Sequence, residues 1–144
     1  MKPPAPLPVA DWPAVRAALV ARIDRIEGRM TAASERASAV AYAANPELDV
    51  GGIRSRSARQ RARETATYDR AGRIVVEGVR EVRELRSLVK ALDEAVRLGD
   101  AMVAKLASGE MHGRPMTAEE RSAARSLVIS YGRTMRRAKR EARR

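Results

Sequence analysis

Apolar residues recur at steps of three and four along most of the chain, which is the period of an amphipathic α-helix. Asp11 precedes the first such stretch as a candidate N-cap. Asn45-Pro46 ends it, because proline disfavours a helical conformation in the residue before it. The pattern predicts a helix over 11–44. Its apolar face holds Val15, Leu19, Ile23, Ile26, Met30, Ala33, Ala37 and Val40.

A second periodic stretch follows a turn at 46–53 and contains no proline. Ser57 and Gln60 have the spacing of a capping box at its start. Two sets of positions then repeat every seven residues, as in a coiled coil: Tyr68, Val75, Val82, Val89, Val96 and Val103, and Ala71, Gly78, Leu85, Leu92, Gly99 and Leu106. This pattern predicts one helix over 57–108, about 78 Å long at about 1.5 Å per residue.

A third helix is predicted over 117–143, after a turn at 109–116. Thr117 and Glu120 form a capping box. The apolar face contains Ala124, Leu127, Val128, Tyr131, Met135 and Ala138. No useful stretch of strand-like alternation occurs, so the expected fold class is all-α.

Short connections predict three long antiparallel helices in a helical bundle or coiled-coil-like arrangement. Along a straight middle helix, the first and third helices overlap only near 80–90, which leaves the heptad seam incompletely covered within one chain. We therefore expect a homo-oligomer, with a dimer favoured. The alternative is a self-contained three-helix bundle, bent at Gly72, Gly78 or Gly99. The expected oligomer contacts are Val82, Leu85, Val89, Leu92 and Val96.

The rest of the composition excludes several classes of protein. Residues 1–10 are proline-rich and expected to be extended, ahead of a helical domain over 11–144. The chain has no cysteine, which excludes disulfides, thiolate nucleophiles and cysteine metal sites. No apolar run is long enough for a signal peptide or a membrane span. We expect a cytoplasmic protein without membrane association.

The net charge of +11 is segregated along the chain. Residues 51–80 carry eight basic and three acidic side chains, and residues 117–144 carry nine and three. The remaining two segments, 1–50 and 81–116, each carry six of either sign and are neutral. Codon bias explains an excess of Arg over Lys but not this segregation. The segregated charge favours a polyanionic partner, and the helix geometry predicts that the two basic segments meet.

The first candidate site is a run of arginines where the middle helix begins: Arg54, Arg56, Arg59, Arg61 and Arg63. Cations are unfavourable at a helix N-terminus, whose dipole end is already positive. A bound phosphate resolves that conflict, because free backbone N–H groups and guanidinium groups both bind it. The alternative is a solvated helix start.

The second candidate site is the basic run near the C-terminus: Arg133, Arg136, Arg137, Lys139 and Arg140. Its spacing is interpreted as a frayed basic tail that contacts phosphates without sequence preference. A solubilising tail is the alternative.

The sequence contains no recognisable set of catalytic residues. His112 is the sole histidine and lies in a glycine-flanked turn, where we expect solvent exposure rather than a metal or catalytic role. We expect a non-enzymatic protein with no cofactor and no bound metal. The favoured function is a nucleic-acid-binding accessory protein for DNA or RNA. The alternatives are a helical scaffold or adaptor that binds an acidic protein partner, and an inhibitor-like binder.

Overall fold

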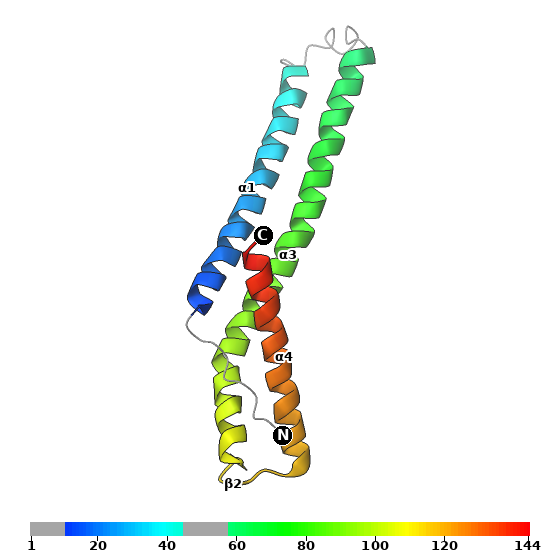
Figure 1. Cartoon of the computed structure of the whole chain (residues 1–144). Helices are drawn as coiled ribbons and strands as arrows, with labels where there is room; N and C mark the ends of the chain where they lie inside the picture. The colour runs from blue at the N-terminus through cyan, green and yellow to red at the C-terminus, as the bar shows by residue number, and fades with distance from the viewer. Residues whose placement is uncertain (1–10, 45–57) are drawn as a thin grey trace. The chain divides into compact units, whose positions relative to one another are not determined.

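The computed structural model describes residues 11–44 and 58–144 and confirms the all-α class (Figure 1). Helix α1 spans Trp12–Ala44, α3 spans Ala58–Ser108 and α4 spans Ala118–Ala142. These limits lie within one residue of the helices expected from the sequence. The proline-rich segment 1–10, the turn at 46–53 and the capping box at Ser57 lie outside the described residues.

Contacts divide the chain into two compact units. Unit 1 contains the residues up to Arg22 together with Leu85–Arg144, and unit 2 contains Ile23–Glu84. Helices α1 and α3 contribute to both units, whereas α4 belongs to unit 1 alone.

The core of unit 1 draws on all three helices. Its buried apolar side chains are Trp12, Val15, Leu19, Leu85, Leu88, Leu92, Ala95, Met116, Ala124, Val128, Met135 and Ala138. They recur at helical spacing, so each helix buries one stripe and exposes the rest of its surface. A salt bridge lies at the edge of this core, where Arg16 Nε donates to Asp93 Oδ1 at 2.9 Å.

The heptad seam is covered by the chain itself where the oligomer contact was expected. Val82, Leu85 and Leu92 are 6%, 3% and 1% exposed. Val89 and Val96 are half-buried. The expected oligomer contact at this seam stays a prediction, but Val82, Leu85 and Leu92 are already covered within the single chain. The physical reason is that unit 1 combines parts of all three helices, which together enclose Leu85 and Leu92.

The core of unit 2 combines the bulky side chains of Ile23, Ile26 and Val82 with small residues. Ala33, Ala37 and Ala71 form a buried cluster between α1 and α3. Gly78 is also buried, and a Cβ atom placed there would lie only 2.5 Å from Met30 Sδ and 3.4 Å from Ile26 Cγ2. Glycine at position 78 therefore leaves room for the Met30 side chain of α1.

A short hairpin joins α3 to α4, within the segment predicted as a turn at 109–116. Strands β1 (Glu110–Met111) and β2 (Arg114–Pro115) pair antiparallel. The two residues between them, His112 and Gly113, have φ values of 54° and 75°. Two left-handed residues are typical of the tight turn that matches the twist of paired strands. Strands of two residues are too short to produce a recognisable alternation in the sequence.

Replacing Gly78 with valine should destabilise the protein, because the new side chain collides with Met30. Overpacking of this kind costs about 1–3 kcal/mol. Urea unfolding followed by circular dichroism measures the effect. Gly28→Val is the matched control, since a Cβ at position 28 meets no atom within 4 Å. Equal unfolding midpoints for the two variants would show that close packing at Gly78 is unimportant.

Candidate nucleic-acid interface

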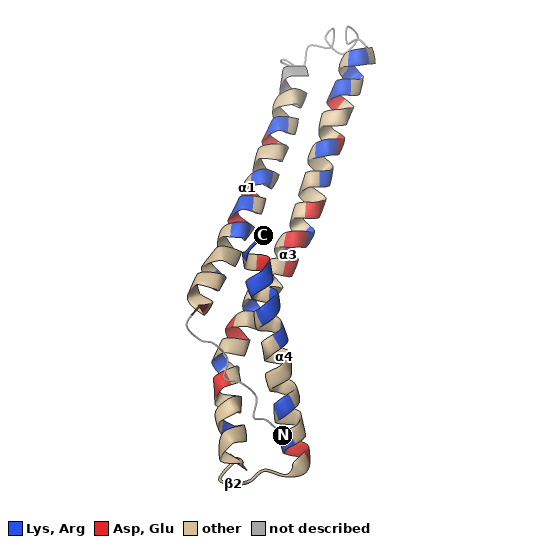
Figure 2. Ribbon diagram, in the orientation of Figure 1, with Lys and Arg blue, Asp and Glu red and all other residues tan. Residues whose placement is uncertain are grey.

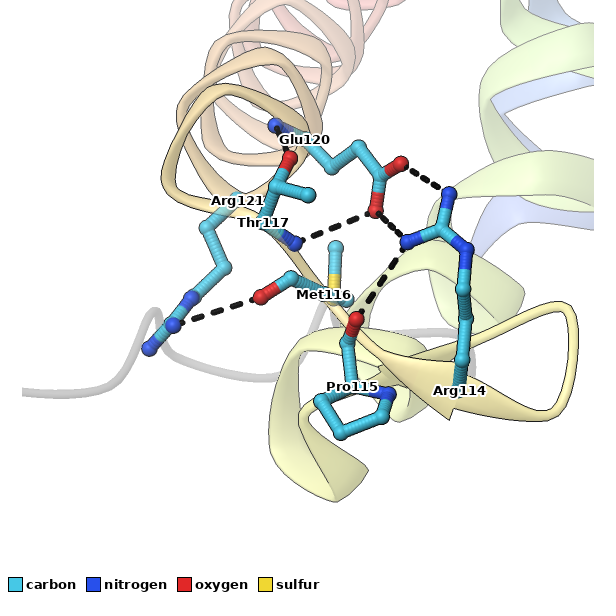
Figure 3. Close-up of polar contacts among 6 residues, drawn as sticks. All are labelled: Arg114, Pro115, Met116, Thr117, Glu120 and Arg121. Carbon is cyan, nitrogen blue, oxygen red and sulfur yellow. Dashed lines mark hydrogen bonds and ion pairs between the residues drawn. The ribbon is translucent and has the colours of Figure 1, made fainter.

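Helix α4 is fixed at its N-terminus by the predicted capping box, which the structure confirms (Figure 3). The Glu120 backbone N–H donates to Thr117 Oγ1 at 3.2 Å, and the Thr117 N–H donates to Glu120 Oε2 at 3.2 Å. Arg114 Nη1 donates to the same Glu120 oxygen at 3.1 Å. The Arg114 hydrogen bond, helped by the Thr117 N–H, lowers the pKa of Glu120. The ionised carboxylate thus links the hairpin to the helix start.

The C-terminal half of α4 is held against α1. Arg22 Nη1 donates to Glu141 Oε2 at 2.9 Å and to the Glu141 backbone oxygen at 3.0 Å. The two side chains are only 15% and 17% exposed. Lys139 Nζ lies 3.9 Å from Asp11 Oδ2. The interpretation of this segment as a frayed tail is therefore wrong, because α4 continues to Ala142 on a buried face.

Four arginines of α4 lie on a single exposed face, which we call the arginine stripe. Its members are Arg133, Arg136, Arg137 and Arg140. Their spacing of three and four residues places them above one another, one turn apart. The opposite face of α4 carries Met135 and Ala138, which are 3% and 0% exposed. Figure 2 shows the basic residues gathered over the last turns of this helix.

Lys139, the fifth residue of the predicted C-terminal site, lies outside the stripe. It is half-buried and its ammonium group faces Asp11. The sequence predicted all five cations as members of one basic tail. The buried inner face instead divides them into four solvent-facing arginines and one lysine at the contact with the start of α1.

The predicted site at the start of the middle helix is described in part. Arg59, Arg61 and Arg63 are exposed in the first turns of α3, whose first turn contains no acidic residue. Arg59 and Arg63 are four residues apart and share a face, whereas Arg61 projects from the opposite side. Arg54 and Arg56 lie outside the described residues.

The two basic sites belong to different units, since the first turns of α3 lie in unit 2 and the stripe lies in unit 1. Their expected meeting stays a prediction. Each site is therefore considered as a separate cationic surface.

Residues 11–44 and 58–144 contain few groups suited to other kinds of chemistry. No group of three or more His, Asp or Glu side chains in these ranges is placed to hold a metal ion. His112 is exposed at the tip of the hairpin. No helix in the same ranges is both long and apolar enough to cross a membrane.

Sequence reasoning missed the polar contacts that hold the helices to one another. Arg22 and Glu141 are 119 positions apart, and Arg16 and Asp93 are 77 apart. A local pattern cannot pair residues at such separations. The available signal was weaker: Glu141 is the only acidic residue in the basic segment after Glu120, which marks it as a candidate partner.

Comparison with protein-family models, curated proteins and solved structures gave no match. The function therefore has to be inferred from the residues of this chain.

Acid should weaken the attachment of α4. The hydrogen bond from Arg22 lowers the pKa of Glu141 below its usual range. A lowered folded-state pKa gives stability that is fully present above the unfolded value of about 4.3 and is lost as the pH falls through the folded value. We expect Glu141→Gln to reduce the free energy of unfolding at neutral pH and to flatten its loss below about pH 4.3.

A double-mutant cycle with Arg22→Gln checks the cause of that change. If the pair is responsible, Arg22→Gln destabilises the Glu141→Gln protein less than it destabilises the wild type. Urea unfolding at several pH values gives all four free energies. Strictly additive effects, or an unchanged pH dependence in Glu141→Gln, would contradict the assignment.

Proposed function

We propose that this protein binds the phosphate backbone of nucleic acid, DNA or RNA, through the arginine stripe of α4, and that it catalyses no reaction. The supporting observation is that four exposed guanidinium groups share one face of a helix whose other face is buried. Arginine suits this task because its planar group donates two parallel hydrogen bonds to a phosphate. The stripe rises about 10 Å along the helix, and duplex DNA carries about one charge per 1.7 Å.

The attachment of α4 supports this function energetically. Arg22, Met135 and Ala138 hold the helix that carries the stripe. The backbone of this helix is already ordered when the protein folds. Binding therefore requires no further ordering of the backbone, which reduces the entropic cost of association. The side chains of the stripe still have to be ordered by the ligand.

The arginines of α3 are proposed as a second phosphate contact. Arg59 and Arg63 share a face near the start of the helix, where backbone N–H groups also favour an anion. Contacts of this kind read charge and shape rather than sequence. We accordingly expect little preference among DNA sequences.

Self-association is part of the proposed function, together with an antiparallel arrangement of the helices. Buried side chains such as Leu85 and Leu92 do not offer a contact surface to a second copy. Exposed apolar side chains do, and α3 carries them at Tyr68, Val76 and Val79. The same exposed side chains would also suit a scaffold or adaptor that binds a protein partner.

Removing two arginines from the stripe should weaken binding and reduce its salt dependence. Each lost phosphate contact lowers the slope of log affinity against log salt concentration by about 0.9. For Arg136→Gln with Arg140→Gln we therefore expect a slope shallower by about 2 on a DNA duplex and on an RNA hairpin. Fluorescence anisotropy between about 50 and 200 mM salt measures this slope.

The matched control removes the same charge elsewhere. Arg25 on α1 and Arg97 on α3 are exposed and lie outside both candidate sites. Arg25→Gln with Arg97→Gln should leave the slope close to that of the wild type. An equal loss in both double variants would mean that net charge, and not the stripe, determines binding. An acidic protein partner would remain as the ligand if neither nucleic acid binds at low salt, and the proposed function would then be wrong.

A further inference from the structure

We infer that a second copy of this chain docks on an exposed face of α3 in unit 2. This surface, which we call the valine face, consists of Tyr68, Gly72, Val76 and Val79. Tyr68 is 46% exposed, Val76 70% and Val79 45%. The inference rests on the self-association proposed above and names its surface and symmetry, and it does not depend on nucleic-acid binding.

The valine face is distinct from the side of α3 that packs on α1. Ala71, Gly78 and Val82 are the buried residues of α3 in unit 2. Successive residues on a helix are about 100° apart, so Val76 and Val79 lie on a different side of the helix from Gly78. Scattered exposed apolar residues are common on protein surfaces, but a row of them on one helix face indicates an interaction surface.

Gly72 provides an independent observation within this face. It is exposed in the interior of a helix, where glycine is less stabilising than alanine. A Cβ atom at this position would meet nothing within 4 Å in the chain. Packing within the chain therefore gives no reason for a glycine, in contrast to Gly78, where Met30 occupies the space. A second helix lying close against Gly72 would supply that reason.

A shallow groove lies on the adjoining surface of unit 2. Met30, Ser34 and Ser38 of α1 line this groove together with Val75 of α3. Most of these side chains are small, so a helix resting on the valine face can also approach α1. Four helices, two from each copy, would then enclose apolar surface that two helices leave open.

The valine face is complementary to itself when α3 pairs with its antiparallel copy. A two-fold axis between positions 75 and 76 brings the two copies of Val76 within one residue of facing each other. The same axis places Gly72 opposite Val79, so that the larger side chain meets the space left by the glycine. A symmetric contact of this kind is closed and produces a dimer rather than a chain of subunits.

The charges beside the valine face agree with this register. Asp69 and Arg83 border the same side of the face and come within one residue of facing each other across the axis. Both are exposed in the single chain. The two-fold axis repeats this pair of opposite charges at both ends of the contact, which favours a second copy over a partner of unrelated sequence.

The mass in solution tests the inference, measured by light scattering and sedimentation after nuclease digestion. The wild type should have twice the mass of one chain. Val76→Arg should raise the dimer dissociation constant by at least about tenfold. Gly72→Leu should do the same, while both variants keep the helical circular dichroism of the wild type. A monomeric wild type at high micromolar concentration would overturn the inference.

Two controls separate the valine face from general effects of the substitutions. Ile129 on α4 is 54% exposed, so Ile129→Arg repeats the change at another exposed apolar position. Gly28→Leu repeats the glycine substitution where the chain is equally open. Both should remain dimeric. If the controls dissociate as readily as Val76→Arg, the contact lies elsewhere.

Charge exchange tests the register itself. Asp69→Arg and Arg83→Asp should each weaken the dimer, and the two together should restore it. A double variant no tighter than either single one would contradict the antiparallel pairing. Because these measurements contain no nucleic acid, their failure leaves the proposed function of the arginine stripe unaffected.

Discussion

The burial of one face of α4 is the constraint on which the candidate function depends. Met135 and Ala138 face inward, and Arg22 donates hydrogen bonds to the side chain and to the backbone oxygen of Glu141. With that face fixed, the arginines at three- and four-residue spacing have to point to solvent together. A free basic tail would present the same charges in no fixed arrangement. The contact between α1 and α4 therefore fixes the basic residues of this segment as one cationic surface.

In unit 2, by contrast, the two helices pack closely but leave apolar side chains exposed. Apart from Ile23, Ile26 and Val82, the buried residues described in this unit are small: Ala33, Ala37, Ala71 and Gly78. Small residues permit close approach but bury little apolar area, so they contribute less hydrophobic free energy than leucines would. Larger apolar residues such as Val76 then remain at the surface of this unit. A second copy would cover them.

Local pattern predicted the helices well, because their limits depend on nearby residues. Thr117 and Glu120, which are only three positions apart, identify the start of α4. The heptad repeat identifies α3. The tertiary arrangement needs distant residues, and here the sequence was insufficient. It did not reveal that Leu85 and Leu92 are enclosed by the chain's own helices, nor that Glu141 pairs with Arg22. The arginine stripe was recognised as a set of residues, but its single face became apparent only with the buried side of α4.

The most direct test of the central claim is the salt dependence of wild-type binding to a DNA duplex and an RNA hairpin. If the four arginines of the stripe and Arg59 and Arg63 each contact a phosphate, log affinity should fall linearly with log salt concentration, with a slope of about −5 on duplex DNA. A similar dependence on the hairpin would indicate that backbone charge is the feature recognised. Affinity that is absent at low salt, or that does not change with salt, would contradict the account.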